Sequence, residues 1–118
     1  MALYALGTMR AEFFTPESQK DDDNPTRFKI KGVDGANINT VMEGATFRDD
    51  MLFLSASGIR AALKFGLVDW ENMLDPETES EIKFKQGKIR LIPWKEQQEI
   101  ASEIVDRSNL MGEQTKNS

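Results

Sequence analysis

The sequence predicts an α+β fold, in which a small N-terminal antiparallel β-sheet is accompanied by two short helices and a longer C-terminal helix. Three observations lead to this prediction. Apolar and polar residues alternate in an early segment, two short amphipathic segments each end at a glycine, and a longer amphipathic segment follows Pro93. The 118 residues suit one domain, and we expect it to cover residues 1–111, with a flexible tail at 112–118.

The predicted sheet begins near the N-terminus. Residues 1–14 are moderately apolar and supply one or two strands, although their pattern leaves a helix open. They lack the basic start of a signal peptide, so we expect them to belong to the mature protein. Residues 26–31 alternate Phe28 and Ile30 with basic residues, as in a strand that is buried on one face.

The intervening residues 15–25 contain two prolines and a run of three aspartates, a composition that predicts a loop. The acidic run invites comparison with a calcium site. An EF-hand loop places its ligands at alternating positions around a central glycine, whereas Asp21, Asp22 and Asp23 are consecutive and have no such glycine. We therefore interpret this run as a solvated loop without a metal.

Two short helices are predicted at residues 35–43 and 56–65. In each segment apolar residues recur at helical spacing and form one face. These residues are Ile38, Val41 and Met42 in the first segment, and Ile59, Ala62 and Leu63 in the second. Each segment also has a capping side chain before it and a glycine after it. The caps and stops are Asp34 and Gly44 for the first helix, and Ser55 or Ser57 with Gly66 for the second.

The middle of the chain is predicted to be irregular apart from short extended segments. Asp49 and Asp50 form a turn before the apolar residues 51–54. Apolar and charged residues alternate in 81–84 and again in 88–91, which predicts a short hairpin or two extended segments.

The longest helix is predicted over residues 93–109. Proline suits a first helical position, because the N–H that it lacks would have no partner there. Acidic residues occupy one face of this helix, and apolar residues form the opposite stripe. The stripe consists of Trp94, Ile100, Ala101, Ile104 and Val105.

Histidine and cysteine are both absent from the sequence, which excludes several kinds of active site. Disulfides, cysteine-ligated zinc and the Ser–His and Cys–His nucleophile pairs are all unavailable. Several carboxylate pairs are present, but no local pattern marks one of them as buried, so we interpret them as solvated acids. We therefore expect a protein that is not an enzyme and needs neither a cofactor nor a metal. The pairs are Asp49/Asp50, Asp69/Glu71, Glu77/Glu79/Glu81 and Glu99/Glu103.

The formal net charge of −5 makes nucleic acid an unfavourable partner, because the average field repels a polyanion. The cations of residues 83–90 alternate with apolar residues, as they do on a solvated strand face. Arg60 and Lys64 form a like-charged pair on the predicted solvent face of the second helix. No apolar run approaches the ~20 residues of a membrane span, so we expect no membrane partner either.

The two tryptophans are the strongest aromatic anchors in the sequence. Tryptophan is enriched at binding hot spots, but both residues also lie beside apolar neighbours. Core packing is the favoured interpretation for each, more strongly for Trp70 than for Trp94. If the protein binds a partner through its aromatic and helical residues, the candidate binding residues are Trp70, Trp94, Ile100 and Ile104.

Several short motifs in the second half of the chain occur in a recognisable order. They are Ser57-Gly58-Ile59, Ala62-Leu63-Lys64-Phe65-Gly66-Leu67-Val68, Trp70-Glu71-Asn72, Leu91-Ile92-Pro93, Glu103-Ile104, Ser108-Asn109-Leu110 and the ending Glu113-Gln114-Thr115-Lys116-Asn117. These packing and turn residues resemble those of tail assembly chaperones of long-tailed, siphovirus-like bacteriophages. The chain departs from that family at Asp75-Pro76-Glu77, where an Asp-Gly turn is usual.

The resemblance implies a protein that binds the phage tape-measure protein and keeps it soluble in the host cell cytoplasm while the tail tube assembles. The tail tube protein is a second candidate partner. A soluble acidic exterior with a surface that covers an amphipathic helix would suit this role. The six methionines would make such a surface adaptable, although methionines also serve ordinary cores.

Other functions remain in competition with this one. They are a structural head–tail joining or tail terminator protein, a small phage inhibitor of a host protein and, least favoured, a carboxylate enzyme. An inhibitor that mimics nucleic acid needs a dense acidic face, and the cationic segment at 83–90 argues against one. The sequence leaves the oligomeric state open, including a homo-oligomer.

The C-terminal residues generate a prediction about codons. Proteins of the resembled family are often made in two lengths, the longer by a −1 ribosomal frameshift. Thr115-Lys116-Asn117 permits the codons ACA-AAA-AAC, which contain the slippery heptamer A-AAA-AAC, although these residues are also common in any polar tail. We expect gene sequencing to find this heptamer and an overlapping −1 frame. Codons such as ACC-AAG-AAT, or no overlapping frame beyond Ser118, would contradict the expectation.

Overall fold

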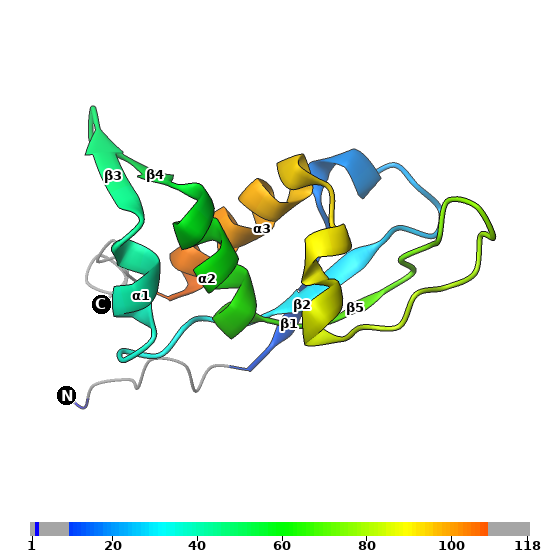
Figure 1. Cartoon of the computed structure of the whole chain (residues 1–118), viewed down its shortest axis with the longest axis horizontal. Helices are drawn as coiled ribbons and strands as arrows, with labels where there is room; N and C mark the ends of the chain where they lie inside the picture. The colour runs from blue at the N-terminus through cyan, green and yellow to red at the C-terminus, as the bar shows by residue number, and fades with distance from the viewer. Residues whose placement is uncertain (1, 3–9, 109–118) are drawn as a thin grey trace.

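A computed structural model of the chain describes residues 2 and 10–108 and confirms the α+β fold (Figure 1). A three-stranded antiparallel sheet and two long helices share one hydrophobic core, while a separate two-stranded hairpin extends away from it. The predicted tail at 112–118, the predicted helix end at Asn109 and most of the N-terminal segment 1–14 lie outside the described residues.

The three-stranded sheet has the order β1-β2-β5. Its strands are β1 (Glu12–Phe14), β2 (Arg27–Ile30) and β5 (Leu67–Glu71). The predicted alternation is confirmed in β2, where Phe28 and Ile30 are buried and the basic residues between them lie on the outer face. The third strand was not predicted. It follows α2 directly and places Trp70 opposite Phe28.

The three α-helices lie close to their predicted positions, as α1 (Ile38–Met42), α2 (Ala56–Gly66) and α3 (Trp94–Arg107). The predicted cap of α1 is wrong, because the N-cap residue is Asn37 rather than Asp34. Asp34 accepts hydrogen bonds from the backbone N–H groups of Ala36 and Asn37, at 3.1 and 2.8 Å, and so stabilises the turn that leads into α1. Ser55, rather than Ser57, caps α2, because its hydroxyl oxygen accepts from the N–H of Gly58 at 3.3 Å.

The hairpin consists of β3 (Ala45–Arg48) and β4 (Met51–Leu54). The turn predicted at Asp49 and Asp50 is confirmed, with φ of 50° and 65° at these two positions. A two-residue hairpin turn with positive φ at both positions matches the twist of the flanking strands, and aspartate tolerates this conformation.

The hairpin or pair of extended segments predicted at 81–84 and 88–91 is wrong in its second half. Residues there form the 3₁₀-helix η2 (Gln86–Leu91), and Glu81 makes an isolated bridge with Leu74. Ile89 and Ile92 both pack against the core, whereas Leu91 is exposed. A spacing of three fits the three residues per turn of a 3₁₀-helix, but it would place Ile89 and Ile92 on opposite faces of a strand. A second 3₁₀-helix, η1 (Glu17–Gln19), lies within the predicted loop.

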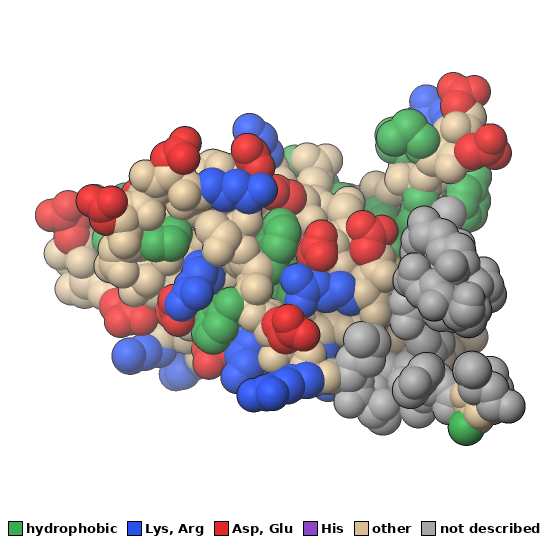
Figure 2. All heavy atoms as spheres, turned by 180° about the vertical axis from the view of Figure 1, so that it is seen from behind, with side chains coloured by type: hydrophobic (Ala, Val, Ile, Leu, Met, Phe, Trp, Pro, Cys, Tyr) green, Lys and Arg blue, Asp and Glu red, His purple; other side chains and the backbone are tan. Residues whose placement is uncertain are grey.

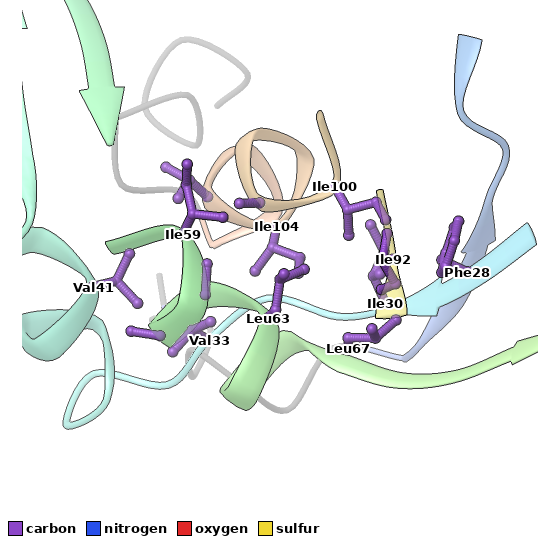
Figure 3. Close-up of a cluster of buried hydrophobic side chains, with 14 of the residues drawn as sticks. Phe28, Ile30, Val33, Val41, Ile59, Leu63, Leu67, Ile92, Ile100 and Ile104 are labelled. Atoms are coloured by element: carbon purple, nitrogen blue, oxygen red, sulfur yellow. The ribbon is translucent and has the colours of Figure 1, made fainter. Parts of the chain in front are cut away.

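The core lies where α2 and α3 meet each other and the buried face of the sheet (Figure 3). Gly66 permits this close approach, since a Cβ atom there would lie only 2.5 Å from Cγ2 of the fully buried Ile104. The end of α3 is fixed to the chain that leaves β2, because the buried Ser108 hydroxyl accepts from the N–H of Val33 at 2.7 Å. The same hydroxyl donates to the carbonyl of Ile104.

Trp70→Ala is predicted to lower the free energy of unfolding by about 3–5 kcal/mol. The indole is 4% exposed, meets the rings of Phe28 and Phe84 edge to face, and donates from Nε1 to the carbonyl of Ile82 at 2.7 Å. Denaturant unfolding followed by circular dichroism measures the loss. Trp94→Ala is the matched control, because half-exposed Trp94 should cost under about 1 kcal/mol. Equal losses in the two variants would contradict this assignment.

Gly66→Ala is predicted to destabilise the domain by about 1–2 kcal/mol, although alanine is the better helix former. The added methyl group collides with three side-chain atoms of Ile104, all within 3.0 Å of its ideal position. Gly35→Ala provides the control, because a Cβ atom there meets nothing within 4 Å. The same unfolding measurement decides the matter, and a Gly66→Ala variant at least as stable as the parent protein would refute the close contact.

Candidate partner-binding surface

The four candidate binding residues do not share one surface. Trp70, Ile100 and Ile104 lie inside the core, so the core-packing interpretation of Trp70 is confirmed. Trp94 lies at the surface, 45% exposed, and its core-packing interpretation is wrong. The first buried residue of α3 is Gln97, one turn further along, and it donates from Nε2 to the carbonyl of buried Ile92 at 2.8 Å. Trp94 lies at the start of the helix, before Gln97, and faces solvent.

Trp94 borders a groove of about 620 Å³, which we name the Trp94 groove. Three elements form its walls: two successive turns of α2, the 3₁₀-helix η2 and the first turn of α3. The lining residues are Arg60, Lys64, Gln86, Gly87, Ile89, Arg90, Trp94 and Gln97. The groove therefore combines an indole ring and an aliphatic side chain with three cationic groups.

The charge of the Trp94 groove is opposite to that of the whole protein. Arg60, Lys64 and Arg90 are all exposed, and no described residue that lines the groove is acidic. Within residues 10–108, none of the ion pairs involves these three cations. On the reverse face of the molecule, acidic and basic side chains are instead interspersed (Figure 2). The groove is thus a local positive site on a protein of net charge −5.

The projecting β3–β4 hairpin is a second exposed apolar surface. Phe47, Met51 and Phe53 are all large and exposed, and the guanidinium of Arg48 lies 5.4 Å from the centre of the Phe53 ring. Figure 2 shows this hairpin standing apart from the body, with apolar and acidic side chains close together on it. Exposed apolar groups concentrated on one element are typical of contact surfaces.

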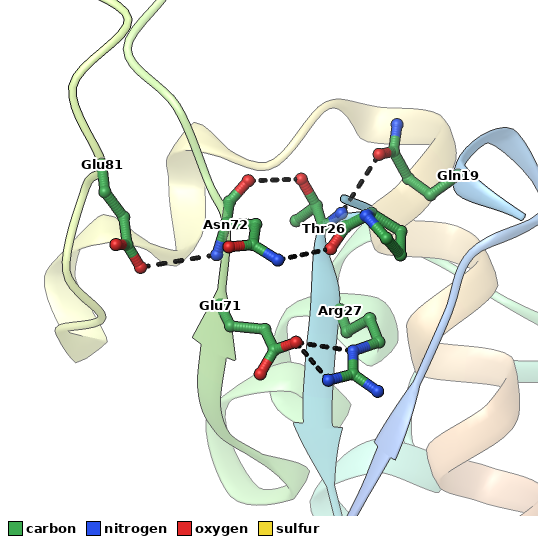
Figure 4. A network of polar contacts seen from close by, with 7 residues as sticks. Gln19, Thr26, Arg27, Glu71, Asn72 and Glu81 are labelled. Carbon is green, nitrogen blue, oxygen red and sulfur yellow. Dashed lines mark hydrogen bonds and ion pairs between the residues drawn. The ribbon is translucent and has the colours of Figure 1, made fainter. Parts of the chain in front are cut away.

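A further hollow of about 470 Å³ lies between the loop of residues 15–25 and the end of β5. Its polar groups bond to one another (Figure 4). Thr26 donates from its hydroxyl to the carbonyl of Asn72 at 2.7 Å and from its N–H to the side chain of Gln19 at 3.1 Å. Asn72 donates in turn to the carbonyl of Pro25 at 2.9 Å. These bonds hold the loop against the sheet, which explains the polar groups without a ligand.

Most of the carboxylate pairs singled out from the sequence have structural partners. Glu71 pairs with Arg27, and Glu103 pairs with Arg107. Asp69 accepts from the N–H of Trp70 at 2.8 Å, and Glu99 accepts from that of Glu17 at 2.9 Å. Outside these pairs, the backbone N–H groups of Glu77 and Thr78 donate to Asp75 and lower the pKa of its carboxyl group. Among the described residues, no group of three or more acidic side chains is arranged to hold a metal ion. These carboxylates therefore stabilise turns and element contacts.

Sequence reasoning missed the Trp94 groove because three separate elements build it. The one local signal of this site was the pair Arg60 and Lys64. These two like charges lie one turn apart on the solvent-exposed side of α2 and repel each other. The sequence predicts an extended strand for the segment that contains Arg90. It therefore gives no sign that Arg90 lines the same groove as Arg60 and Lys64.

Within residues 10–108, no helix is both long and apolar enough to cross a membrane. Comparisons of the chain with protein-family models, with curated proteins and with solved structures find no match.

Proposed function

We propose that the protein binds a helical segment of another protein and keeps it soluble, as a tail assembly chaperone does for a tape-measure protein. The observation that carries this proposal is the half-exposed Trp94 at the edge of a groove, while the other tryptophan is buried. An exposed tryptophan beside a groove is a typical anchor for a partner, because its large rigid ring gains much contact area on binding.

The separation of core and surface supports a binding role. The domain core is built from Trp70 and aliphatic side chains, so Trp94 is not needed to complete it. The Trp94 groove and the exposed hairpin together supply two apolar contact surfaces on a protein of net charge −5. An acidic exterior favours solubility, and apolar surfaces allow an amphipathic helix to be covered.

The choice of tape-measure protein as partner comes from the motifs in residues 55–110 that resemble tail assembly chaperones. A tape-measure protein is long and apolar and would aggregate before the tail tube encloses it. The proposed site of action is the host cell cytoplasm, with the tail tube protein as a second candidate partner.

A structural head–tail joining or tail terminator protein is the second candidate. The exposed hairpin favours it, because two-stranded elements with unpaired edges and apolar side chains form contacts between subunits. The two functions differ in oligomeric state. Ring formation by the protein alone on size exclusion with light scattering would favour the structural role.

Co-expression with a helical fragment of the tape-measure protein is predicted to leave that fragment soluble and bound. Size exclusion should show one complex, and Trp94→Ala should weaken it by about 2 kcal/mol, or roughly 30-fold in Kd. Since Trp94 is half-exposed, the unfolding free energy of the variant should stay near that of the parent. An insoluble fragment with no co-eluting complex would refute the chaperone function.

A further inference from the structure

We propose that the Trp94 groove accepts an acidic amphipathic helix, with an apolar side chain against Ile89 and Trp94 and carboxylates beside the three cations. This inference rests on the proposed function, because it names the chemistry of the partner segment. It follows from three properties of the groove: its positive charge, its apolar lining, and the hydrogen bonds that its two glutamine side chains already make.

The cations are placed to meet carboxylates that lie along a helix. Arg60 and Lys64 lie one turn apart on α2, so both project toward the same side. Arg90 comes from η2 and adds a third positive charge to the lining. Acidic side chains three or four residues apart on a partner helix have a similar spacing, and each carboxylate would neutralise a cation that has no ion pair within residues 10–108.

The other polar groups of the groove already have partners. The side-chain amide of Gln97 donates to the carbonyl of Ile92 at 2.8 Å, and that of Gln86 donates to the carbonyl of Lys64 at 3.5 Å. The groups that remain for recognition are therefore cationic or apolar. Because these bonds already fix two of the lining side chains, a partner orders fewer groups on binding.

An acidic peptide fits this arrangement better than nucleic acid does. The three cations gather in one groove, whereas the protein as a whole carries a net charge of −5. A single strand of nucleic acid carries a charge on every nucleotide and would extend beyond the groove into the negative field of the rest of the protein. A helix with a few carboxylates beside an apolar stripe can match the groove alone.

Two labelled synthetic helices test the charge preference with the full chain. Both carry the same leucine stripe, and the remaining positions are mostly glutamate in one and mostly lysine in the other. Fluorescence anisotropy at low salt should give a Kd at least tenfold lower for the glutamate helix, with the difference shrinking as salt rises. A short single-stranded oligonucleotide is the third probe. Its binding more tightly than the glutamate helix would overturn the proposal.

Charge-reversed variants locate the binding to the groove. The triple variant Arg60→Glu, Lys64→Glu, Arg90→Glu should lose at least tenfold in affinity for the glutamate helix and gain affinity for the lysine helix. The control Arg10→Glu, Lys20→Glu, Lys83→Glu changes the net charge equally at exposed positions outside the groove and the hairpin, and it should keep the glutamate preference. Equal losses in the two triple variants would overturn the proposal.

A steric variant provides evidence that does not depend on charge. A Cβ atom at Gly87 meets nothing within 4 Å, so Gly87→Leu adds bulk at the groove without a clash. Gly35→Leu has the same open surroundings away from the groove and serves as control. Gly87→Leu should weaken binding of the glutamate helix at least fivefold, while Gly35→Leu leaves it unchanged. Unchanged binding in Gly87→Leu would overturn the groove assignment.

The same variants separate this inference from the proposed function. If the tape-measure fragment is kept soluble equally well by the parent protein and both groove variants, the function stands and the groove assignment fails. If the glutamate helix binds through the groove but the tape-measure fragment stays insoluble, the groove assignment stands and the tape-measure partner is wrong.

Discussion

The contact between Gly66 and Ile104 sets the distance between the two long helices, and the rest of the domain depends on that distance. Gly66 ends α2, accepts a hydrogen bond from the N–H of Lys31 through its carbonyl at 2.9 Å, and is followed directly by β5. One small residue therefore joins helix packing to the sheet. It also fixes the spacing of the walls of the Trp94 groove, because α2 and α3 each supply one of them.

Local signals predicted much of the fold, because they depend on neighbouring residues only. The alternation around Phe28, the turn that begins at Asp34 and the cap at Ser55 are of this kind. The sequence did not reveal β5, which is a strand because it pairs with β2. It did not reveal η2 either, because a short alternation of apolar and charged residues concealed the spacing of three between Ile89 and Ile92. The groove could not be predicted at all, because it arises only when α2, η2 and α3 come together.

The prediction that Trp94 packs in the core was wrong for the same reason, because burial depends on how separate elements come together. Helical periodicity aligns it with Ala101 and Val105, and all three belong to one helix. Periodicity identifies a face but not where along the helix that face becomes buried, and in α3 burial begins only at Gln97. Ile100 and Ile104 lie in the core and stabilise the domain, whereas Trp94 lies outside the core and is available to contact a partner. The surface can consequently vary with the partner while the fold is preserved.

The hydrogen bond between Val33 and Ser108 bears on how the protein is made. It joins residues 75 positions apart, and it lies in the buried interior beside Gly32, where an added Cβ atom would touch the carbonyl of Arg107. During synthesis the sheet and α2 leave the ribosome well before the end of α3 does. Until Ser108 emerges, the N–H of Val33 has no hydroxyl to bind and the apolar side of α2 lacks the part of its cover that α3 supplies. The nascent chain is therefore itself exposed to aggregation, and it completes its fold only when the last turn of α3 has been translated.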